Sequence, residues 1–321
     1  MPTRVRIVVP GDDPPQIQGS PHLNRLEPYG DVVLYDSRPR DLAEQLARVR
    51  QAQVVINTRG AVKWPAAALG ALPDLRLIAT CSIGTDMIDL AAAARLGIAV
   101  ANQPGRTAPV VAEHMFGLMF ALAKRAAFQT AELKAGRWTR ALNTMLRGKR
   151  LGVVGVGPVG AEMARLGRAV GMEVVAWTFH PTAARAADLG VRFVELDELL
   201  RTADVVSLHV RLTPATHHLI DARRLAMMRP GALLLNGARG DVVDMGSLVQ
   251  ALHDGRLGGA ALDVYPEEPL PADHPILRCE QVVLTPHAAD QTPEGVELLN
   301  EGAVDNVIAF LEGRPQNLVG G

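Results

Sequence analysis

Short apolar runs alternate with amphipathic stretches along most of the chain. The runs predict strands, and in the first hundred residues these are Val5–Val9, Val32–Tyr35, Val54–Asn57, Leu75–Thr80 and Ile98–Ala101. The stretches between them that predict helices are Pro39–Arg50, Pro65–Leu72 and Asp89–Leu96. Apolar strands separated by helices are typical of βαβ units, in which a parallel sheet is covered on both faces.

The same alternation starts again after a long helical pattern at Thr107–Ala135. Further strands are predicted from Leu151 and near Glu173–Thr178, Val191–Val194, Val205–Val210, Ala232–Asn236, Ala260–Val264 and Val282–Thr285, followed by a last helix at Pro293–Glu312. The sequence therefore predicts an α/β protein of two doubly wound parallel-sheet domains with a cleft between them. Residues 1–100 and 287–321 are expected to form a discontinuous, flavodoxin-like substrate domain, and residues 101–286 a Rossmann dinucleotide-binding domain.

The segment Arg150–Gly160, RLGVVGVGPVG, joins an apolar run to a helical stretch through closely spaced glycines. Gly155, Gly157 and Gly160 have G-x-G-x-x-G spacing. The first glycine permits a tight turn, the second lets a pyrophosphate approach the backbone, and the third lets the helix pack close to the strand. Because the helix N-terminus then faces the phosphates, we predict a dinucleotide site that also includes Pro158 and Val159.

Composition narrows the class of partner. The chain has 321 residues, of which 48% are hydrophobic, and a formal net charge of −1. This balance indicates neither a nucleic acid nor a membrane surface as a partner, and the longest apolar runs are too short to span a bilayer. The two cysteines, Cys81 and Cys279, provide neither a disulfide framework nor a metal set. We expect a soluble cytoplasmic protein without a bound metal.

Three polar segments follow predicted strands directly, where the ligands of open α/β sheets bind. They contain Arg239, Asp263 with Glu268 a few residues on, and His287. An arginine can grip a carboxylate with two hydrogen bonds, and a carboxylate beside a histidine holds its tautomer and raises its pKa. Each residue taken singly is explained at least as well as a surface charge or a structural histidine, but at three strand ends of one sheet the three side chains can converge.

Several motifs, in order along nearly the whole chain, resemble the D-isomer-specific 2-hydroxyacid dehydrogenase family. They are SIGTDMIDL (82–90), VANQPGRTAPVVAEH (100–114), the glycine turn, DVVSLHVRLTPATHHLI (204–220), NGARGDVVD (236–244), LDVYPEEPL (262–270) and TPH (285–287). The resemblance implies an NAD(P)-dependent enzyme that reduces a small 2-oxoacid to its D-2-hydroxyacid. Glyoxylate, hydroxypyruvate and larger 2-ketoacids are the candidate substrates.

The same resemblance implies a role for each polar residue at the strand ends. His287 is the acid/base, Glu268 pairs with it, and Arg239 binds the substrate carboxylate and polarises the carbonyl. The backbone N–H groups of Ile83 and Gly84 also hold the carboxylate. Further candidates are Arg59 for the substrate and Thr107, Ala238 and Asp263 for the cofactor, with Asp263 accepting a hydrogen bond from the nicotinamide carboxamide.

The chain departs from the family in the loop after the second strand of the nucleotide domain. Thr178 stands where NAD-dependent members carry an acid, so the group that repels a 2′-phosphate is missing. His180 and Arg185 supply positive charge nearby. We therefore predict NADP as the cofactor, with NAD as the alternative.

Other departures concern the substrate. Asn57 occupies the place where phosphoglycerate dehydrogenases carry an arginine for the phosphate, and Asp290 adds a charge after His287 where Gly or Ser is usual. Formate dehydrogenases of the superfamily have Gln where Glu268 stands, which argues against formate.

Two other functions remain open on this scaffold: a non-enzymatic NAD(H)-sensing module similar to transcriptional corepressors of the family, and oxidation of an inorganic oxyanion such as phosphite. The apolar pattern Thr107–Ala127 and the segment through Trp138 and Leu146 predict a homodimer, because in the family this region packs two subunits together. The remaining histidines that we considered lie without a second ligand set and are interpreted as structural or exposed; they are His114, His209, His217 and His218.

Overall fold

The computed structural model describes residues 4–320, which form two compact units. The first unit runs up to Thr107 and resumes at Gln291, and the second is Ala108–Asp290. The boundaries predicted from the sequence, after residues 100 and 286, precede these positions by a few residues. Within residues 4–320, none of the helices combines the length and the apolar character of a membrane span.

A five-stranded parallel sheet lies at the centre of the first unit. Its strands have the order β2-β1-β3-β4-β5, with the bounds β1 Val5–Val9, β2 Gly30–Leu34, β3 Val54–Thr58, β4 Leu77–Cys81 and β5 Ala99–Ala101. The helices of this unit are α1 Leu42–Val49, α2 Ala66–Gly70, α3 Leu90–Arg95 and α11 Pro293–Leu311, with a 3-10 helix, η1, at Pro21–Leu26.

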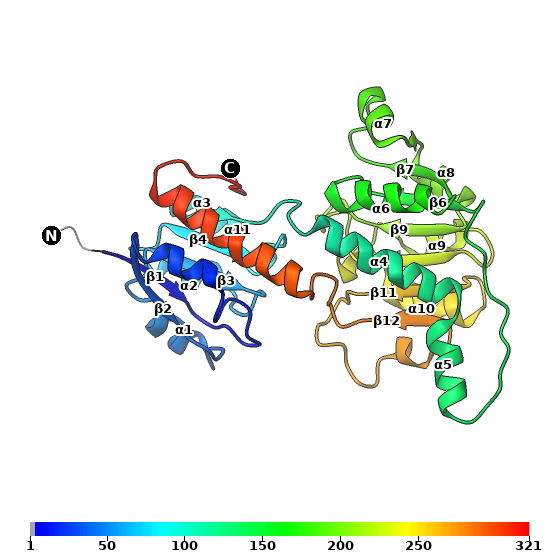
Figure 1. Ribbon diagram of the computed structural model, residues 1–321, viewed down its shortest axis with the longest axis horizontal. Helices are drawn as coiled ribbons and strands as arrows, with labels where there is room; N and C mark the ends of the chain where they lie inside the picture. The colour runs from blue at the N-terminus through cyan, green and yellow to red at the C-terminus, as the bar shows by residue number, and fades with distance from the viewer. Residues whose placement is uncertain (1–3, 321) are drawn as a thin grey trace. The chain divides into compact units, whose positions relative to one another are not determined.

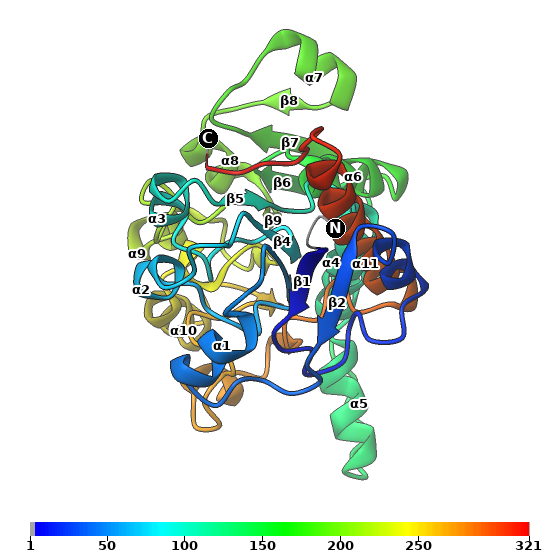
Figure 2. The same ribbon diagram turned by 90° about the vertical axis from the view of Figure 1, so that its left-hand side faces the viewer.

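Both faces of this sheet are buried, because successive residues of each strand point to opposite sides. Val55 and Ile78 pack with α1, α2 and α3, whereas their neighbours Ile56 and Leu77 pack with η1 and α11. Figure 2 shows α1, α2 and α3 on one side of the sheet and α11 on the other. This two-sided burial explains why the strands read as continuous apolar runs in the sequence.

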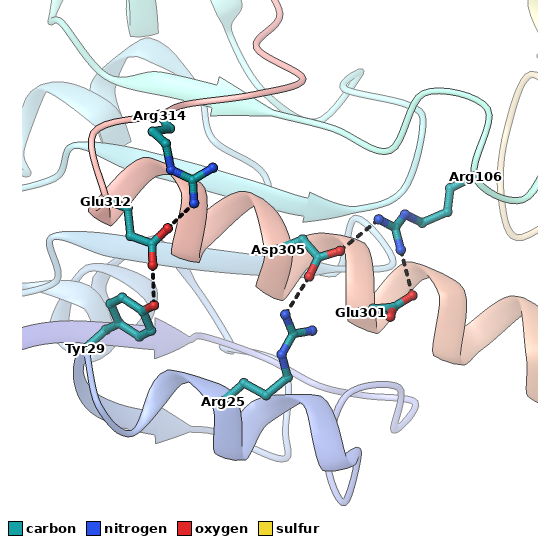
Figure 3. Close-up of polar contacts among 7 residues, drawn as sticks. All are labelled: Arg25, Tyr29, Arg106, Glu301, Asp305, Glu312 and Arg314. Carbon is teal, nitrogen blue, oxygen red and sulfur yellow. Dashed lines mark hydrogen bonds and ion pairs between the residues drawn. The ribbon is translucent and has the colours of Figure 1, made fainter.

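Helix α11 comes from the end of the chain and covers the sheet of the first unit. Its apolar residues Val304 and Val307 are fully buried there. Polar contacts add to this packing (Figure 3), and they join Arg25 to Asp305 at 2.8 Å, Arg106 to Asp305 at 2.9 Å, Arg106 to Glu301 at 2.8 Å, Tyr29 to Glu312 at 2.6 Å, and Arg314 to Glu312. Because part-exposed ion pairs contribute at most about 1 kcal/mol each, the buried apolar face contributes most to holding this helix on the sheet.

The second unit is built around a seven-stranded parallel sheet of order β12-β11-β10-β9-β6-β7-β8. The strands are β6 Arg150–Val154, β7 Glu173–Trp177, β8 Arg192–Phe193, β9 Val205–Leu208, β10 Leu233–Asn236, β11 Gly259–Leu262 and β12 Val282–Leu284. The helices are α4 Ala108–Ala123, α5 Ala126–Lys134, α6 Pro158–Ala169, α7 Ala183–Leu189, α8 Leu196–Thr202, α9 Ala222–Met227 and α10 Met245–His253, with the 3-10 helices η2 Gly240–Val242 and η3 Pro275–Arg278.

Helices cover both faces of this sheet as well. α4 and α6 lie side by side on one face (Figure 1), and their core includes Met115 and Met163. α8, α9 and α10 form the other core, which includes Leu199, Leu225 and Leu248. Two parallel sheets, each wound with helices on both faces, confirm the predicted fold class.

The single long helix predicted at Thr107–Ala135 is wrong, because the structure divides it into α4 and α5. Arg125 separates the two helices and has a left-handed backbone with φ of +48°. Its N–H donates to the carbonyl oxygen of Leu122 at 3.0 Å, which closes the last turn of α4, and its guanidinium lies 4.3 Å from the centre of the Phe128 ring. The helical pattern of the sequence continues across this break, so periodicity alone does not reveal it.

Candidate active site

The glycine turn joins β6 to α6, and two of its glycines leave no room for a side chain. Gly155 has φ of +92°, and a Cβ there would lie 2.8 Å from the carbonyl oxygen of His209. A Cβ at Gly160 would lie 2.0 Å from the carbonyl oxygen of Gly155. These approaches are closer than real Cβ contacts, so the turn and the packing of α6 on β6 require glycine at both positions.

Gly157, by contrast, borders open space. A Cβ there would meet no atom within 4 Å. Gly157 is the N-cap of α6 and has no side chain to accept from the first turn, and Pro158 follows it as the first helical residue. The N–H groups at this helix end are therefore left for a ligand, together with the positive end of the helix dipole. These features fit the pyrophosphate of a dinucleotide.

Arg185 lies beside the glycine turn although it comes from α7. One of its Nη atoms donates to the carbonyl oxygen of Val156, between the first two glycines, at 3.1 Å; the other donates to that of His180 at 2.9 Å. The N–H of the first glycine donates to the carbonyl oxygen of Trp177 at 2.8 Å, which places the end of β7, followed by Thr178, at the same turn. The charged group that these contacts bring to the turn is a guanidinium.

Three neighbouring strands bring the other candidates to one edge of the same sheet. β10, β11 and β12 are parallel neighbours, and their last residues pair in register. Arg239, Asp263 and His287 follow these three strand ends within three residues. The sheet therefore collects a guanidinium, a carboxylate and an imidazole at its carboxyl edge, as the sequence indicates.

Gly240 lets two segments of this edge come together. A Cβ at Gly240 would lie 2.0 Å from the carbonyl carbon of Tyr265, so the segment after β10 passes directly against the one that carries Glu268. The Tyr265 hydroxyl lies 3.2 Å from the carbonyl oxygen of Leu262 and 3.0 Å from that of Thr285. Burial raises the pKa of Tyr265 to about 12, with a smaller effect of nearby acids. Tyr265 therefore stays a neutral donor that joins the ends of β11 and β12.

His287 and Glu268 form a hydrogen-bonded pair. Nδ1 of His287 lies 2.7 Å from Oε2 of Glu268, whose Oε1 accepts from the N–H of Tyr265 at 2.9 Å. His287 has φ of +51°, which is uncommon for a residue with a side chain, and 47% of its side chain is exposed. Because Nδ1 is engaged by the carboxylate, Nε2 is the nitrogen left for a ligand.

The pair shifts both pKa values toward the ionised forms. The hydrogen bond to Glu268 raises the pKa of His287 above its ordinary value of 6.5, against the effects of burial and of the Arg239 charge. Burial raises the pKa of Glu268, but hydrogen bonds from His287 and Tyr265, with the nearby cations, outweigh it and lower the pKa overall. The protonated imidazole therefore stabilises the folded state below pH 6.5, and this contribution is lost as the pH rises through the raised pKa.

Asp263 holds the loop that carries the imidazole. Its side chain is 1% exposed. Oδ1 accepts from the Thr285 hydroxyl at 2.6 Å and from the Ala288 N–H at 2.9 Å, and Oδ2 accepts from the Ala289 N–H at 3.0 Å. Three bonds to one loop give Asp263 a positioning role that the sequence does not reveal. Its contact with a nicotinamide carboxamide stays a prediction.

His114 belongs to the same network, although the sequence indicates only a structural or exposed histidine. Its Nε2 lies 3.2 Å from the Thr285 hydroxyl and 3.5 Å from Oδ1 of Asp263. His114 ends one of the motifs that carry the family resemblance, and that motif is the only sequence signal for its placement. His209, in contrast, is a buried neighbour of the glycine turn: its Nε2 bonds the Ser207 hydroxyl at 2.8 Å, and burial lowers the pKa of His209 to about 4.

Ala238, a predicted cofactor residue, follows β10 in the second unit, and its N–H donates to Oδ1 of Asn236 at 3.0 Å. Other predicted site residues belong to the first unit. The carbonyl oxygens of Ile83 and Gly84, just after β4, accept from Asn102 at 2.7 Å and from Ser82 at 2.8 Å. Among the hydrogen bonds of residues 4–320, neither N–H of this pair has a protein acceptor, which leaves both for a carboxylate. Their role in binding substrate stays a prediction.

Arg59 and Thr107 also belong to the first unit. Arg59 follows β3 with φ of +47°, and its Nε is buried without a partner in the described part of the chain. Asn57 instead turns inward and donates to the carbonyl oxygen of Val62 at 3.2 Å. Thr107 is 1% exposed and precedes α4. The ligand contacts of Arg59 and Thr107 stay predictions.

A protein-family model and several named proteins match this chain. Residues 116–289 match the family model described as D-isomer specific 2-hydroxyacid dehydrogenase, NAD binding domain. The chain is 36% identical over 308 residues to a glyoxylate reductase of Aeropyrum pernix, and the match covers 92% of each chain. This is a family-level likeness over almost the full length.

Two solved structures have the same fold. One is the NADPH-dependent glyoxylate/hydroxypyruvate reductase of Sinorhizobium meliloti in complex with NADP and malonate, with a TM-score of 0.86, 29% identity, and coverage of 99% of this chain and 97% of the other. The second is D-lactate dehydrogenase of Aquifex aeolicus with NAD and lactic acid, with a TM-score of 0.85, 29% identity, and coverage of 98% and 99%.

Replacing Glu268 is expected to lower the pKa of the His287 imidazole. In the Glu268→Gln variant the hydrogen bond to an anion is lost while the cation of Arg239 remains, so the pKa should fall toward or below 6.5. NMR titration of the His287 ring resonances measures this shift, and His253→Gln provides a control that leaves it in place. An unchanged or higher pKa in the Gln variant would contradict the pairing.

Proposed function

We infer that this chain, which belongs to the D-isomer-specific 2-hydroxyacid dehydrogenase family, is an oxidoreductase that transfers a hydride between NAD(P)H and a small 2-oxoacid or D-2-hydroxyacid. Glyoxylate, hydroxypyruvate and larger 2-ketoacids are the substrates that we propose. The observation that carries this function is the His287–Glu268 pair at 2.7 Å, on the carboxyl edge of the sheet that also bears the glycine turn.

We propose that the protein positions the substrate through its carboxylate. The Arg239 guanidinium can hold the carboxylate and polarise the adjacent carbonyl, because a planar cation matches a planar anion with two hydrogen bonds. Ile83 and Gly84 are proposed to add backbone N–H donors. The nicotinamide, when bound, supplies the hydride to the carbonyl carbon.

His287 is proposed to supply the proton that this transfer requires. As the carbonyl carbon is reduced, negative charge develops on its oxygen, and the proton on Nε2 of the imidazolium neutralises it. Glu268 keeps Nδ1 protonated throughout, so Nε2 is the atom that loses the proton in reduction and regains it in the reverse direction. The hydrogen bond to Glu268 raises the pKa of His287 and so favours the protonated imidazole that reduction requires.

The two alternative functions receive less support. A sensing module needs no acid/base pair, yet the chain carries an imidazole and a carboxylate at hydrogen-bond distance with a guanidinium nearby. An oxyanion such as phosphite lacks the carbonyl that Arg239 and His287 together would polarise and protonate. The relative from Aeropyrum pernix is named as a reductase of a 2-oxoacid, which agrees with the main proposal.

We propose further that NADPH serves at least as well as NADH. The Arg185 guanidinium lies beside the glycine turn and donates hydrogen bonds to the carbonyl oxygens of Val156 and His180. Thr178 follows β7 where an acid would repel a 2′-phosphate. A cation at this position and the absence of the acid both favour the extra phosphate of NADP.

We also propose that the protein is a homodimer formed through α5 and the segment after it. Large apolar side chains are exposed there on a single chain, and Trp138 is 83% and Leu142 95% exposed. Figure 1 shows α5 and the following segment extending beyond the sheet of the second unit. Exposed apolar side chains concentrated on one projecting segment are typical of an interface.

Removing the imidazole is expected to lower kcat by roughly a hundredfold or more in His287→Asn, the size of a general-acid contribution. Arg239→Gln should instead raise KM and lower kcat together, because binding and polarisation both depend on the guanidinium. Steady-state kinetics with a panel of 2-ketoacids measures both effects. In the wild type, the rate of reduction should fall as the pH rises through the pKa of His287. Near-normal turnover by the Asn variant would refute the assignment.

Cofactor choice is tested by kcat/KM for NADPH and NADH with one accepted 2-ketoacid. We expect NADPH to be used at least as well, and Arg185→Ala to reduce kcat/KM for NADPH about tenfold while leaving NADH little changed. Arg192→Ala is the matched control, since Arg192 pairs with Glu198 on the surface. A tenfold wild-type preference for NADH, about 1.4 kcal/mol, would overturn the proposal.

Sedimentation equilibrium tests the homodimer. The wild type is expected to have twice the mass of one chain at micromolar concentration, and the double variant Trp138→Ser with Leu142→Glu is expected to dissociate, because a buried charge would oppose association. Leu318→Glu is the control: Leu318 is 50% exposed but lies in the first unit. A wild-type protein that sediments only as a monomer would rule out the dimer.

A further inference from the structure

Two consecutive histidines and an aspartate form a cluster on the second unit that the proposed reaction does not use. We propose that His217, His218 and Asp241 bind one divalent transition-metal ion, with Zn²⁺ as the best match. One nitrogen of each imidazole and one carboxylate oxygen lie within 4.8 Å of one another.

The backbone holds the two segments of this cluster in register. The N–H of His218 donates to the carbonyl oxygen of Asp241 at 2.7 Å, just before a parallel bridge between Ile220 and Val243. The next bonds of the bridge run from Ile220 to Val242 at 3.0 Å and from Asp244 to Ile220 at 3.0 Å. Because these backbone bonds hold the two segments together, part of the ordering that ion binding requires is already present.

The histidine loop is itself constrained. His218 has φ of +48°, and its ring stacks on that of His217 with 4.0 Å between the ring centres. The buried Thr216 fixes the preceding turn: its hydroxyl accepts from the N–H of Thr213 at 2.8 Å and donates to the carbonyl oxygen of Arg211 at 2.6 Å. The left-handed residue thus brings two successive side chains to one side of the loop.

All three side chains are accessible to an ion. The imidazoles are exposed and the carboxylate is partly exposed. Among the interactions of residues 4–320, none joins these ligand atoms to another side chain by a hydrogen bond or an ion pair. The carboxylate of Asp244, by contrast, caps α10 through Ser247 at 3.1 Å and 2.8 Å, so it adds negative charge near His218 without being a free ligand.

The donor set selects the kind of metal. Two neutral imidazoles and one carboxylate match Zn²⁺, which takes nitrogen and oxygen ligands at about 2.0–2.2 Å in a tetrahedral arrangement. Ca²⁺ and Mg²⁺ prefer six or more oxygen ligands and would find only one carboxylate here. Three protein ligands leave a fourth position for water. A bound ion would join the loop after β9 to η2, which begins directly after Arg239.

Metal binding to the protein freed of metal by EDTA dialysis tests the proposal. Isothermal titration with Zn²⁺ should give one site per chain in the wild type. His217→Gln, His218→Asn and Asp241→Asn should each weaken that site at least tenfold; Asn is chosen at 218 because it tolerates a left-handed backbone. Zn²⁺ should raise the Tm of the wild type and leave that of the three variants nearly unchanged.

Two controls make the result specific. His253→Gln removes another exposed histidine of the second unit, at the end of α10, and His287→Asn removes the imidazole that is paired with Glu268. Both should bind Zn²⁺ like the wild type. Absence of a site in the wild type, wild-type affinity in the three cluster variants, or loss of the site in His287→Asn would overturn the proposal. Co²⁺ bound at the site should give the visible absorption of a tetrahedral complex in the wild type and in both controls.

Discussion

The position of the His287 imidazole depends on a carboxylate that does not reach the surface. Asp263 is 1% exposed. Burying a charged side chain costs on the order of several kcal/mol unless the charge is hydrogen-bonded. The Thr285 hydroxyl and the N–H groups of Ala288 and Ala289 satisfy it. Because all three donors belong to the loop after β12, the hydrogen bonds that satisfy the Asp263 charge also fix the conformation of this loop. His287 lies between these donors in the sequence and has a left-handed backbone with φ of +51°.

Close backbone approaches bring the other groups to the same place. Gly240 passes against Tyr265 at a distance that admits no side chain, so the segment with Arg239 meets the segment with Glu268. Gly160 does the same between α6 and the turn at Gly155. At Gly240 a missing Cβ lets segments from two different strand ends come together, and at Gly160 it lets α6 pack against the turn that precedes it. The parallel strands of the second unit end at one edge of the sheet, and the two glycines let the neighbouring segments approach each other there.

Opposing electrostatic effects act on the pKa of His287, the proposed acid. Glu268 raises the pKa of His287, whereas burial and the Arg239 guanidinium lower it. The Arg239 cation, which suits a substrate carboxylate, therefore disfavours the protonated imidazole of His287. The carboxylate of Glu268 compensates for this effect. In the proposed reaction a substrate carboxylate would neutralise Arg239, and substrate binding would then favour the protonated form of His287.

The sequence by itself determined the elements and the class of chemistry. Apolar runs alternating with helical patterns predicted two doubly wound parallel sheets, because burial on both faces leaves a continuous apolar strand. The glycine spacing indicated the dinucleotide turn, and the strand-end positions of Arg239, Asp263 and His287 placed these residues at one edge, since parallel strands end together. These inferences rest on local periodicity and on a rule of topology, which the order of residues carries.

Only the tertiary structure decided what depends on contacts between distant segments. The break of the long helix at Arg125 follows from one left-handed residue, and the helical pattern passes through it unchanged. Likewise, the sequence does not show that Asp263 holds the His287 loop, that His114 reaches Thr285, or that Asp241 lies beside His217 and His218. The residues of each of these contacts lie far apart in the sequence, whereas the helix break is defined by a single backbone angle. The geometry that joins them arises only when the sheet and its loops pack.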